Sequence, residues 1–155
     1  MFQLAAEEHV LIAAPAHTVW EYRLNFTNLP TYNPSASEVV RVNDGSGVAG
    51  PAGVGAAYEF VLNTDFGPHR VTLTVTDLIV DRVVSAEMNA GLVARELFRV
   101  EPYQAAGKDH SRVSLTLWLD LPEGLEQDTT TPLLEGGRSQ VRDELDAMER
   151  ILSAP

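Results

Sequence analysis

The sequence TPLLEGGRSQVRDELDAMERIL, residues 131–152, has the pattern of one long amphipathic helix. We expect Thr131 to cap it, because its hydroxyl can accept a hydrogen bond from a free backbone N–H, and Pro132 to take the first helical position. Apolar and small residues recur at alternating steps of three and four, which places them on one stripe of a helix. The stripe consists of Leu134, Gly137, Val141, Leu145, Met148 and Leu152.

Two adjacent glycines, Gly136 and Gly137, lie within this predicted helix. Each glycine costs roughly 1 kcal/mol relative to alanine in a helix interior. We interpret the pair as leaving room between the helix and the surface that it covers, or else as marking a bend in the helix.

The middle of the chain has strand patterns. Residues 71–76 alternate apolar residues with threonine, and residues 113–121 carry five apolar residues on one face. Further strands are predicted at residues 9–12, 38–43, 57–63, 83–88 and 92–100, with a polar loop at 104–110. This spacing favours an antiparallel meander, and the terminal helix has the only stripe long enough to cover its hydrocarbon face.

Two short helical segments are expected after the first strand. In residues 16–24 the side chains of Val19, Trp20 and Leu24 share one face, whereas we expect Glu21 and Arg23 to point elsewhere. Residues 25–34 contain two prolines and three asparagines, which indicates a second short helix or an irregular turn. The predicted fold class is therefore α+β, with a curved antiparallel sheet wrapped around the long C-terminal helix, in one domain spanning residues 1–155.

The composition excludes several partners. The chain has 155 residues and a net charge of −11, with a pI near 4.6, so it repels nucleic acid and anionic membrane surfaces. No apolar run is long enough for membrane insertion, and no basic segment precedes the first apolar residues. We therefore expect a cytoplasmic protein.

Known motifs for cofactors, metals and nucleophiles are weak here. Residues 45–50 match the glycine pattern of dinucleotide-binding loops, but Pro51 and another predicted strand follow where a helix should begin. The four histidines are widely spaced and the chain has no cysteine, so no metal site is expected. No cofactor and no serine nucleophile motif are predicted either.

The order of elements and several local motifs resemble the polyketide cyclase/dehydrase branch of the START-like, or SRPBCC, superfamily, which has the helix-grip fold. The resemblance rests on the Ala-Pro at the end of the first strand before Val19 and Trp20, on LPTYNP at residues 29–34, on GVG at 53–55, on SRVSL at 111–115 and on the closing helix. It implies a cavity between the sheet and the long helix.

Strand parity predicts the residues that face this cavity. Glu96 would then be an inward carboxylate, which needs a cationic partner such as Arg82, Arg95, Arg99 or Arg138, unless it reaches solvent or a salt bridge at the rim. His69 shares the inward parity, and together with Glu96 and Tyr32 it is a candidate catalytic residue. The candidate ligand-binding residues are Tyr32, Tyr58, Phe60, Leu73, Val75, Met88, Phe98, Leu115, Leu117, Gly137 and Val141.

The mostly apolar inward face favours one function over two alternatives. The leading hypothesis is a noncatalytic or weakly catalytic binder of a small hydrophobic molecule, lipid- or polyketide-like. The first alternative is a polyketide cyclase, aromatase or dehydratase that uses acid–base residues in the same cavity. The second is an interaction module without a filled cavity. A homodimer is compatible with each of the three.

Overall fold

Seven antiparallel strands form one curved sheet in the computed structural model, which describes residues 1–45 and 53–153. Their order across the sheet is β1-β7-β6-β5-β4-β3-β2, so each strand from β2 to β7 pairs with its neighbour in sequence and β1 closes onto β7. The strands are β1 (Phe2–Ile12), β2 (Ala36–Asn43), β3 (Ala57–Thr64), β4 (Gly67–Ile79), β5 (Val83–Asn89), β6 (Val93–Ala105) and β7 (Lys108–Asp120).

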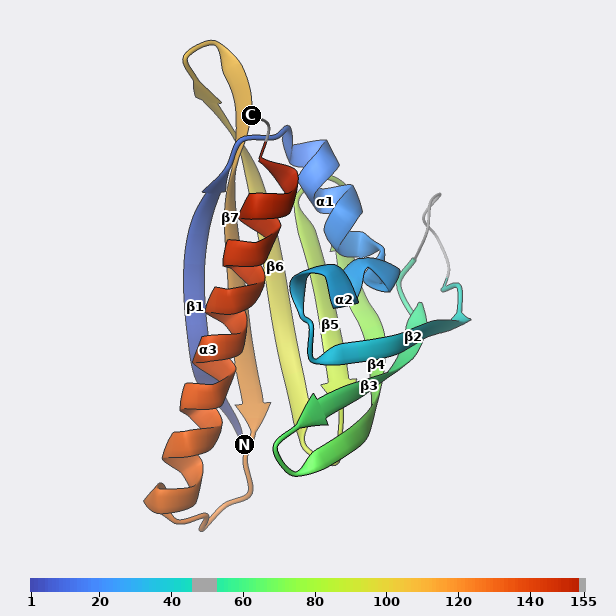
Figure 1. Ribbon diagram of the computed structural model, residues 1–155, viewed down its shortest axis with the longest axis vertical. Helices are drawn as coiled ribbons and strands as arrows, with labels where there is room; N and C mark the ends of the chain where they lie inside the picture. The colour runs from blue at the N-terminus through green and yellow to red at the C-terminus, as the bar shows by residue number, and fades with distance from the viewer. Residues whose placement is uncertain (46–52, 154–155) are drawn as a thin grey trace.

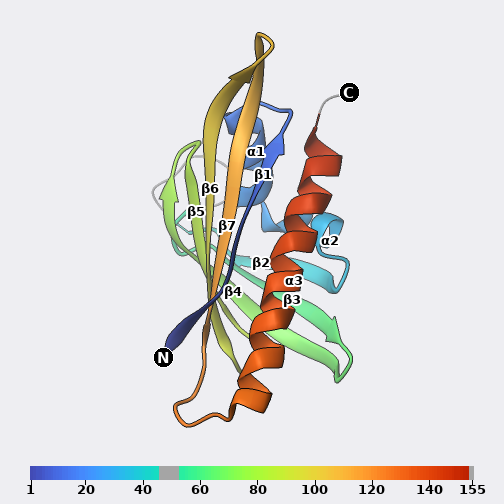
Figure 2. The ribbon, with the colours of Figure 1, turned by 90° about the vertical axis from the view of Figure 1, so that its left-hand side faces the viewer.

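The helices lie on the concave face of this sheet (Figure 1). The long helix α3 (Gln127–Leu152) runs along β1 and β7. Three short helices lie next to α3 on the same face: α1 (Ala16–Leu24), the 3-10 helix η1 (Phe26–Asn28) and α2 (Leu29–Tyr32). Figure 2 shows β5, β6 and β7 on one side of the molecule and α3 on the other, while β2 and β3 curve behind α3. The predicted fold class is confirmed, including the two short helical segments after the first strand.

The core forms where the stripe of α3 meets the inner face of the sheet. Val141, Leu145 and Met148 are buried, and Leu134 and Leu152 at the two ends of the stripe are partly buried against the core. The alternate residues of β7 and β4 meet them from the sheet, as their sequence pattern predicts. Those buried strand residues are Val71, Leu73, Val75, Val113, Leu115, Leu117 and Leu119.

The start of α3 differs from the prediction. The helix begins at Gln127, and the carbonyl of Glu126 accepts hydrogen bonds from the backbone N–H groups of Thr129 and Thr130 at 3.0 and 2.9 Å. Thr131 and Pro132 therefore lie in the second turn, and the predicted cap is wrong. Pro132 thus lies inside the helix, where it has no N–H to donate to the carbonyl of Asp128 and its ring crowds that carbonyl.

Several strands are also longer than predicted, as β1 and the β6–β7 hairpin show. β1 begins at Phe2, because its first residues pair with the end of β7 as far as Asp120. The predicted polar loop at residues 104–110 is mostly paired strand, joined by the two-residue turn Ala106-Gly107. Both turn residues have positive φ, 51° and 74°, which matches the twist that a tight hairpin requires. The glycine-rich pattern at 45–50 falls largely outside the described residues.

Gly137 brings α3 close to the sheet. A Cβ atom built at this position would lie 3.0 Å from the Cβ of Ala5 and 3.2 Å from Cδ2 of Leu117. The glycine thus allows close packing, and the prediction that it leaves room between helix and sheet is wrong. Gly136 points away, since a Cβ atom there would meet no described atom within 4 Å.

This packing predicts opposite effects for the two glycines. Gly137→Leu should lower the free energy of unfolding by about 1–3 kcal/mol, because the added side chain overpacks the contact with Ala5 and Leu117. Gly136→Ala, the matched control, should raise it by about 1 kcal/mol through helix propensity alone. Urea unfolding of both variants measures the difference. Equal stabilisation by both substitutions would contradict the close contact at Gly137.

Candidate functional site

A buried arginine, Arg23, lies at the centre of the most unusual group of side chains in the core. It is in the last turn of α1 and is only 1% exposed. Its Nη2 donates to Oε1 of Glu96 on β6 at 2.9 Å, and its Nη1 donates to Oε1 of Glu144 on α3 at 3.0 Å. We call Arg23, Glu96 and Glu144 the buried charge cluster.

The sequence analysis found only part of this cluster. Glu96 faces inward as predicted, but its partner is Arg23 rather than one of the four arginines proposed, and it lies in the core rather than at the rim. The expectation that Arg23 points away from the core is wrong. A signal was present, because Arg23 follows Val19 by four residues and Trp20 by three, which places it on their face of α1.

Glu144 was missed altogether, although it is 3% exposed. Its second carboxylate oxygen, Oε2, accepts hydrogen bonds from Nδ2 of Asn33 at 3.0 Å and from Nε2 of Gln140 at 3.1 Å. The available signal was its spacing, three residues after Val141 and four before Met148, which puts it beside the apolar stripe. Glu144 therefore links the buried charge cluster to the segment after α2.

The cluster holds two carboxylates and one guanidinium in an apolar setting. Burial raises the pKa of Glu96, Arg23 opposes that rise and the charge of Glu144 adds to it. Burial works against the charge of Arg23, yet the two carboxylates prevail and raise its pKa, so it stays protonated. With both carboxylates ionised the cluster would carry one net negative charge, which favours proton uptake at Glu96.

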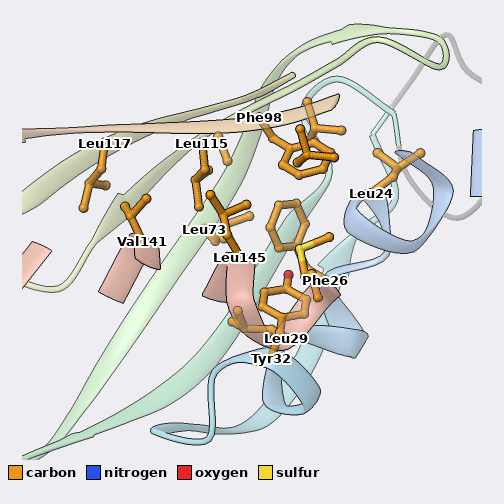
Figure 3. Close-up of a cluster of buried hydrophobic side chains, with 14 of the residues drawn as sticks. Leu24, Phe26, Leu29, Tyr32, Leu73, Phe98, Leu115, Leu117, Val141 and Leu145 are labelled. Atoms are coloured by element: carbon orange, nitrogen blue, oxygen red, sulfur yellow. The ribbon is translucent and has the colours of Figure 1, made fainter. Parts of the chain in front are cut away.

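Aromatic rings surround the guanidinium. The Cζ atom of Arg23 lies 4.9 Å from the ring centroid of Tyr32, 5.4 Å from that of Phe98 and 5.8 Å from that of Phe26. Figure 3 shows these three rings grouped together, with the Tyr32 hydroxyl directed toward the other aromatic rings. Cation–π contacts of this kind stabilise a desolvated cation, so the rings supply part of what water would give Arg23 in solution.

Three buried polar atoms have no hydrogen-bond partner among the described residues. They are Nε of Arg23 and the hydroxyl oxygens of Tyr32 and Tyr58. Burial also raises the pKa of Tyr32, although Arg23 opposes the shift, so its hydroxyl keeps its proton. The rings of Tyr58 and Phe26 are 5.5 Å apart, which places this second hydroxyl in the same aromatic region.

The other residues predicted to form the site differ in how deeply they are buried. His69 is exposed near the start of β4, paired with Leu62, so although it has the inward parity it does not approach Glu96. Met88 is partly buried, and Gly137 lies against Ala5 and Leu117. The remaining candidates are buried on the concave side of the sheet: Phe60, Leu73, Val75, Phe98, Leu115, Leu117 and Val141.

A groove of about 230 Å³ opens beside the buried charge cluster. It lies between the segment after α2, the β3–β4 hairpin and the middle of α3, and we call it the α2–α3 groove. Tyr32 and Glu144 form part of its wall, so the groove reaches the cluster. Its other polar lining residues include Asn33, Asn63, Gln140 and Asp143.

A larger groove of about 620 Å³ lies on the opposite, convex face of the sheet. It is formed over β1, β6 and β7 and includes Trp118, Leu97 and Arg112. No residue of the buried charge cluster lines it, so we place the candidate site at the smaller groove. Within the described ranges, no group of three or more His, Cys, Asp or Glu side chains could hold a metal ion, and no helix could cross a membrane.

A long helix held against a curved antiparallel sheet, with buried polar groups between the two, defines a helix-grip protein. The chain belongs to the family described as polyketide cyclase/dehydrase and lipid transport, whose model matches residues 3–152. The resemblance predicted from the sequence is thereby confirmed.

Solved structures support the same fold. A START superfamily protein from Mycobacterium smegmatis superposes with a TM-score of 0.74 at 13% identity, over 95% of both chains. The Zhui aromatase/cyclase from a Streptomyces species also gives 0.74, at 17% identity over 98% of this chain and 94% of that one. A protein from Deinococcus radiodurans gives 0.63 at 14% identity, over 97% and 95%. No curated protein matches the sequence.

The buried charge cluster predicts a large effect of removing its cation. Arg23→Met should lower the free energy of unfolding by about 3–5 kcal/mol, because two buried carboxylates lose their partner. The control Arg70→Met removes an exposed pair with Glu59 at 3.5 Å and should cost less than about 1 kcal/mol. Urea unfolding measures both values. Adding Glu96→Gln and Glu144→Gln to Arg23→Met should restore part of the lost stability, because the unpaired carboxylates are then removed. Equal costs for Arg23→Met and Arg70→Met would contradict this account.

Proposed function

We propose that the chain binds a small, largely apolar, lipid- or polyketide-like molecule on the concave side of the sheet, with the α2–α3 groove as the entrance. The observation that carries this proposal is that the groove reaches Tyr32 and Glu144, so that it connects solvent with the buried charge cluster. The apolar inner surfaces of β4, β6 and β7 would contact the body of the ligand. Residues that face this side include Tyr58, Phe60, Leu73 and Leu115.

The unpaired polar atoms support the proposal. A buried polar group without a hydrogen bond costs about 1–3 kcal/mol, and the hydroxyls of Tyr32 and Tyr58 and Nε of Arg23 are three such groups. A carbonyl or hydroxyl group of a ligand could pair with them. Pockets for small molecules commonly combine an apolar wall with a few convergent polar groups.

The size of the groove bears on how a ligand would enter. Its volume of about 230 Å³ is below the range of roughly 300–1,000 Å³ that is typical of ligand pockets. A ligand larger than the groove therefore requires the segment after α2 to move away from α3. The hydrogen bond from Asn33 to Glu144 is the polar contact that such a movement would break.

A bulky residue at the entrance should weaken binding. Ser35 is exposed and lines the α2–α3 groove, so Ser35→Trp should reduce the affinity for the neutral apolar dye Nile red by about tenfold or more. Thr72→Trp is the matched control, because Thr72 is exposed on the opposite face of the sheet. Fluorescence titration gives both affinities, and native mass spectrometry of the purified protein tests for a retained ligand.

The outcome separates this proposal from its rivals. An unmodified protein that takes up neither Nile red nor a retained ligand would overturn it. Equal weakening of Nile red binding by both tryptophan variants would contradict the placement of the entrance at the α2–α3 groove.

The second candidate function is a polyketide cyclase, aromatase or dehydratase. It is favoured by the acid–base character of the buried charge cluster, where burial raises the pKa of Glu96 and Arg23 stands beside it. Glu96 would exchange a proton with the substrate, while the Tyr32 hydroxyl would polarise a carbonyl oxygen. The solved aromatase/cyclase with the same fold is consistent with this chemistry.

This candidate predicts that Glu96→Gln removes turnover of a poly-β-keto substrate while Nile red binding persists. The loss should be about a hundredfold or more, the usual contribution of a general acid or base. Product analysis by mass spectrometry measures it, with Glu87→Gln, an exposed carboxylate on β5, as the control. An unchanged product distribution in the Glu96 variant would remove the enzyme hypothesis and leave the binding proposal standing.

A further inference from the structure

The lining of the α2–α3 groove has a one-sided charge. Asp143 and Glu144 contribute two carboxylates, and none of the described residues that line the groove is basic. Arg23 lies deeper and is already engaged with Glu96 and Glu144. The entrance is therefore negative, which matters for any group that would remain in it.

The hydrogen-bond donors of the groove are mostly engaged by the protein. The amide nitrogens of Asn33 and Gln140 both donate to Oε2 of Glu144. Nδ2 of Asn63 donates to the carbonyl of Ser35 and to Oγ of Ser37, each at 3.3 Å. Both donors of the Asn63 amide are thus used, whereas Asn33 and Gln140 each keep one further N–H.

The acceptors of the groove are largely unused. Oε1 of Gln140, Oδ1 of Asn63 and the carboxylate of Asp143 have no hydrogen-bond partner in the described part of the chain. Glu144 accepts three hydrogen bonds, whereas a carboxylate offers about four lone-pair sites. At the inner end the Tyr32 hydroxyl, which can both donate and accept, is also unpaired in a residue that is 1% exposed.

From this imbalance we infer that the ligand carries a hydrogen-bond-donating, non-anionic polar end, a hydroxyl or an ammonium, which lies in the α2–α3 groove against Gln140, Asp143 and Glu144. The inference rests on the proposed binding function and narrows its ligand class. A carboxylate or phosphate end would face two carboxylates, and no basic residue of the described lining offsets their charge, so the groove rejects it. The apolar part of the ligand then extends from this end toward the core.

Matched amphiphiles of one chain length test the inference. Decanol, decylammonium and decanoate differ only in the polar end, and their displacement of Nile red can be measured below their micelle concentrations. Decanol and decylammonium should bind about tenfold or more tightly than decanoate, since unit charges a few ångströms apart at a protein surface interact by more than 1 kcal/mol. The preference of decylammonium over decanoate should weaken as salt is added.

A charge variant adds an internal control. Asp143→Asn should reduce the preference for decylammonium over decanoate by about fivefold, because the carboxylate that faces the polar end becomes neutral. Asp146→Asn makes the same change on an exposed residue of α3 that is not part of the groove wall, and should leave the preference nearly unchanged. Both positions are exposed, so neither substitution should disturb the core.

The results distinguish this inference from the proposed function. Displacement by all three amphiphiles with equal affinity, or tightest binding of decanoate, would overturn the inference and leave the binding function in place. Equal effects of Asp143→Asn and Asp146→Asn would also overturn the placement of the polar end. Absence of Nile red binding to the unmodified protein would overturn both.

Discussion

The structure depends on one buried guanidinium. Arg23 is almost fully enclosed, and a desolvated cation is tolerated only where acceptors and rings replace its water. Its two carboxylate partners come from β6 and α3, so the ion pairs connect the end of α1 to the middle of the sheet and to the long helix. A shift of one of these elements would leave a buried charge without its partner, which costs about 3–5 kcal/mol.

Glu144 extends this constraint to the surface. One of its oxygens bonds Arg23, while the other accepts from Asn33 and Gln140 at the wall of the α2–α3 groove. A single side chain therefore both pairs with the buried cation and lines the groove.

Which faces are buried was predictable, whereas the pairing of the buried polar groups was not. The stripe of α3 and the alternation in β4 and β7 follow from periodicity, and parity placed Glu96 inside. The pairing of Arg23 with Glu96 and Glu144 joins residues 73 and 121 positions apart, and no local pattern specifies such a contact. Four other arginines were plausible partners until the register of the sheet and the position of α1 were known.

Gly137 shows the same division at one residue. Its position on the stripe of α3 could be read from the spacing of its neighbours, and so could the cost of a glycine in a helix. Whether the missing side chain leaves space or allows close contact depends on the residues opposite Gly137. These are Ala5 of β1 and Leu117 of β7, which are far from Gly137 in the sequence. Periodicity reports which face of an element is buried, because it reflects local geometry. Distances across the core depend on how separate elements pack against one another, so only the tertiary structure determines them.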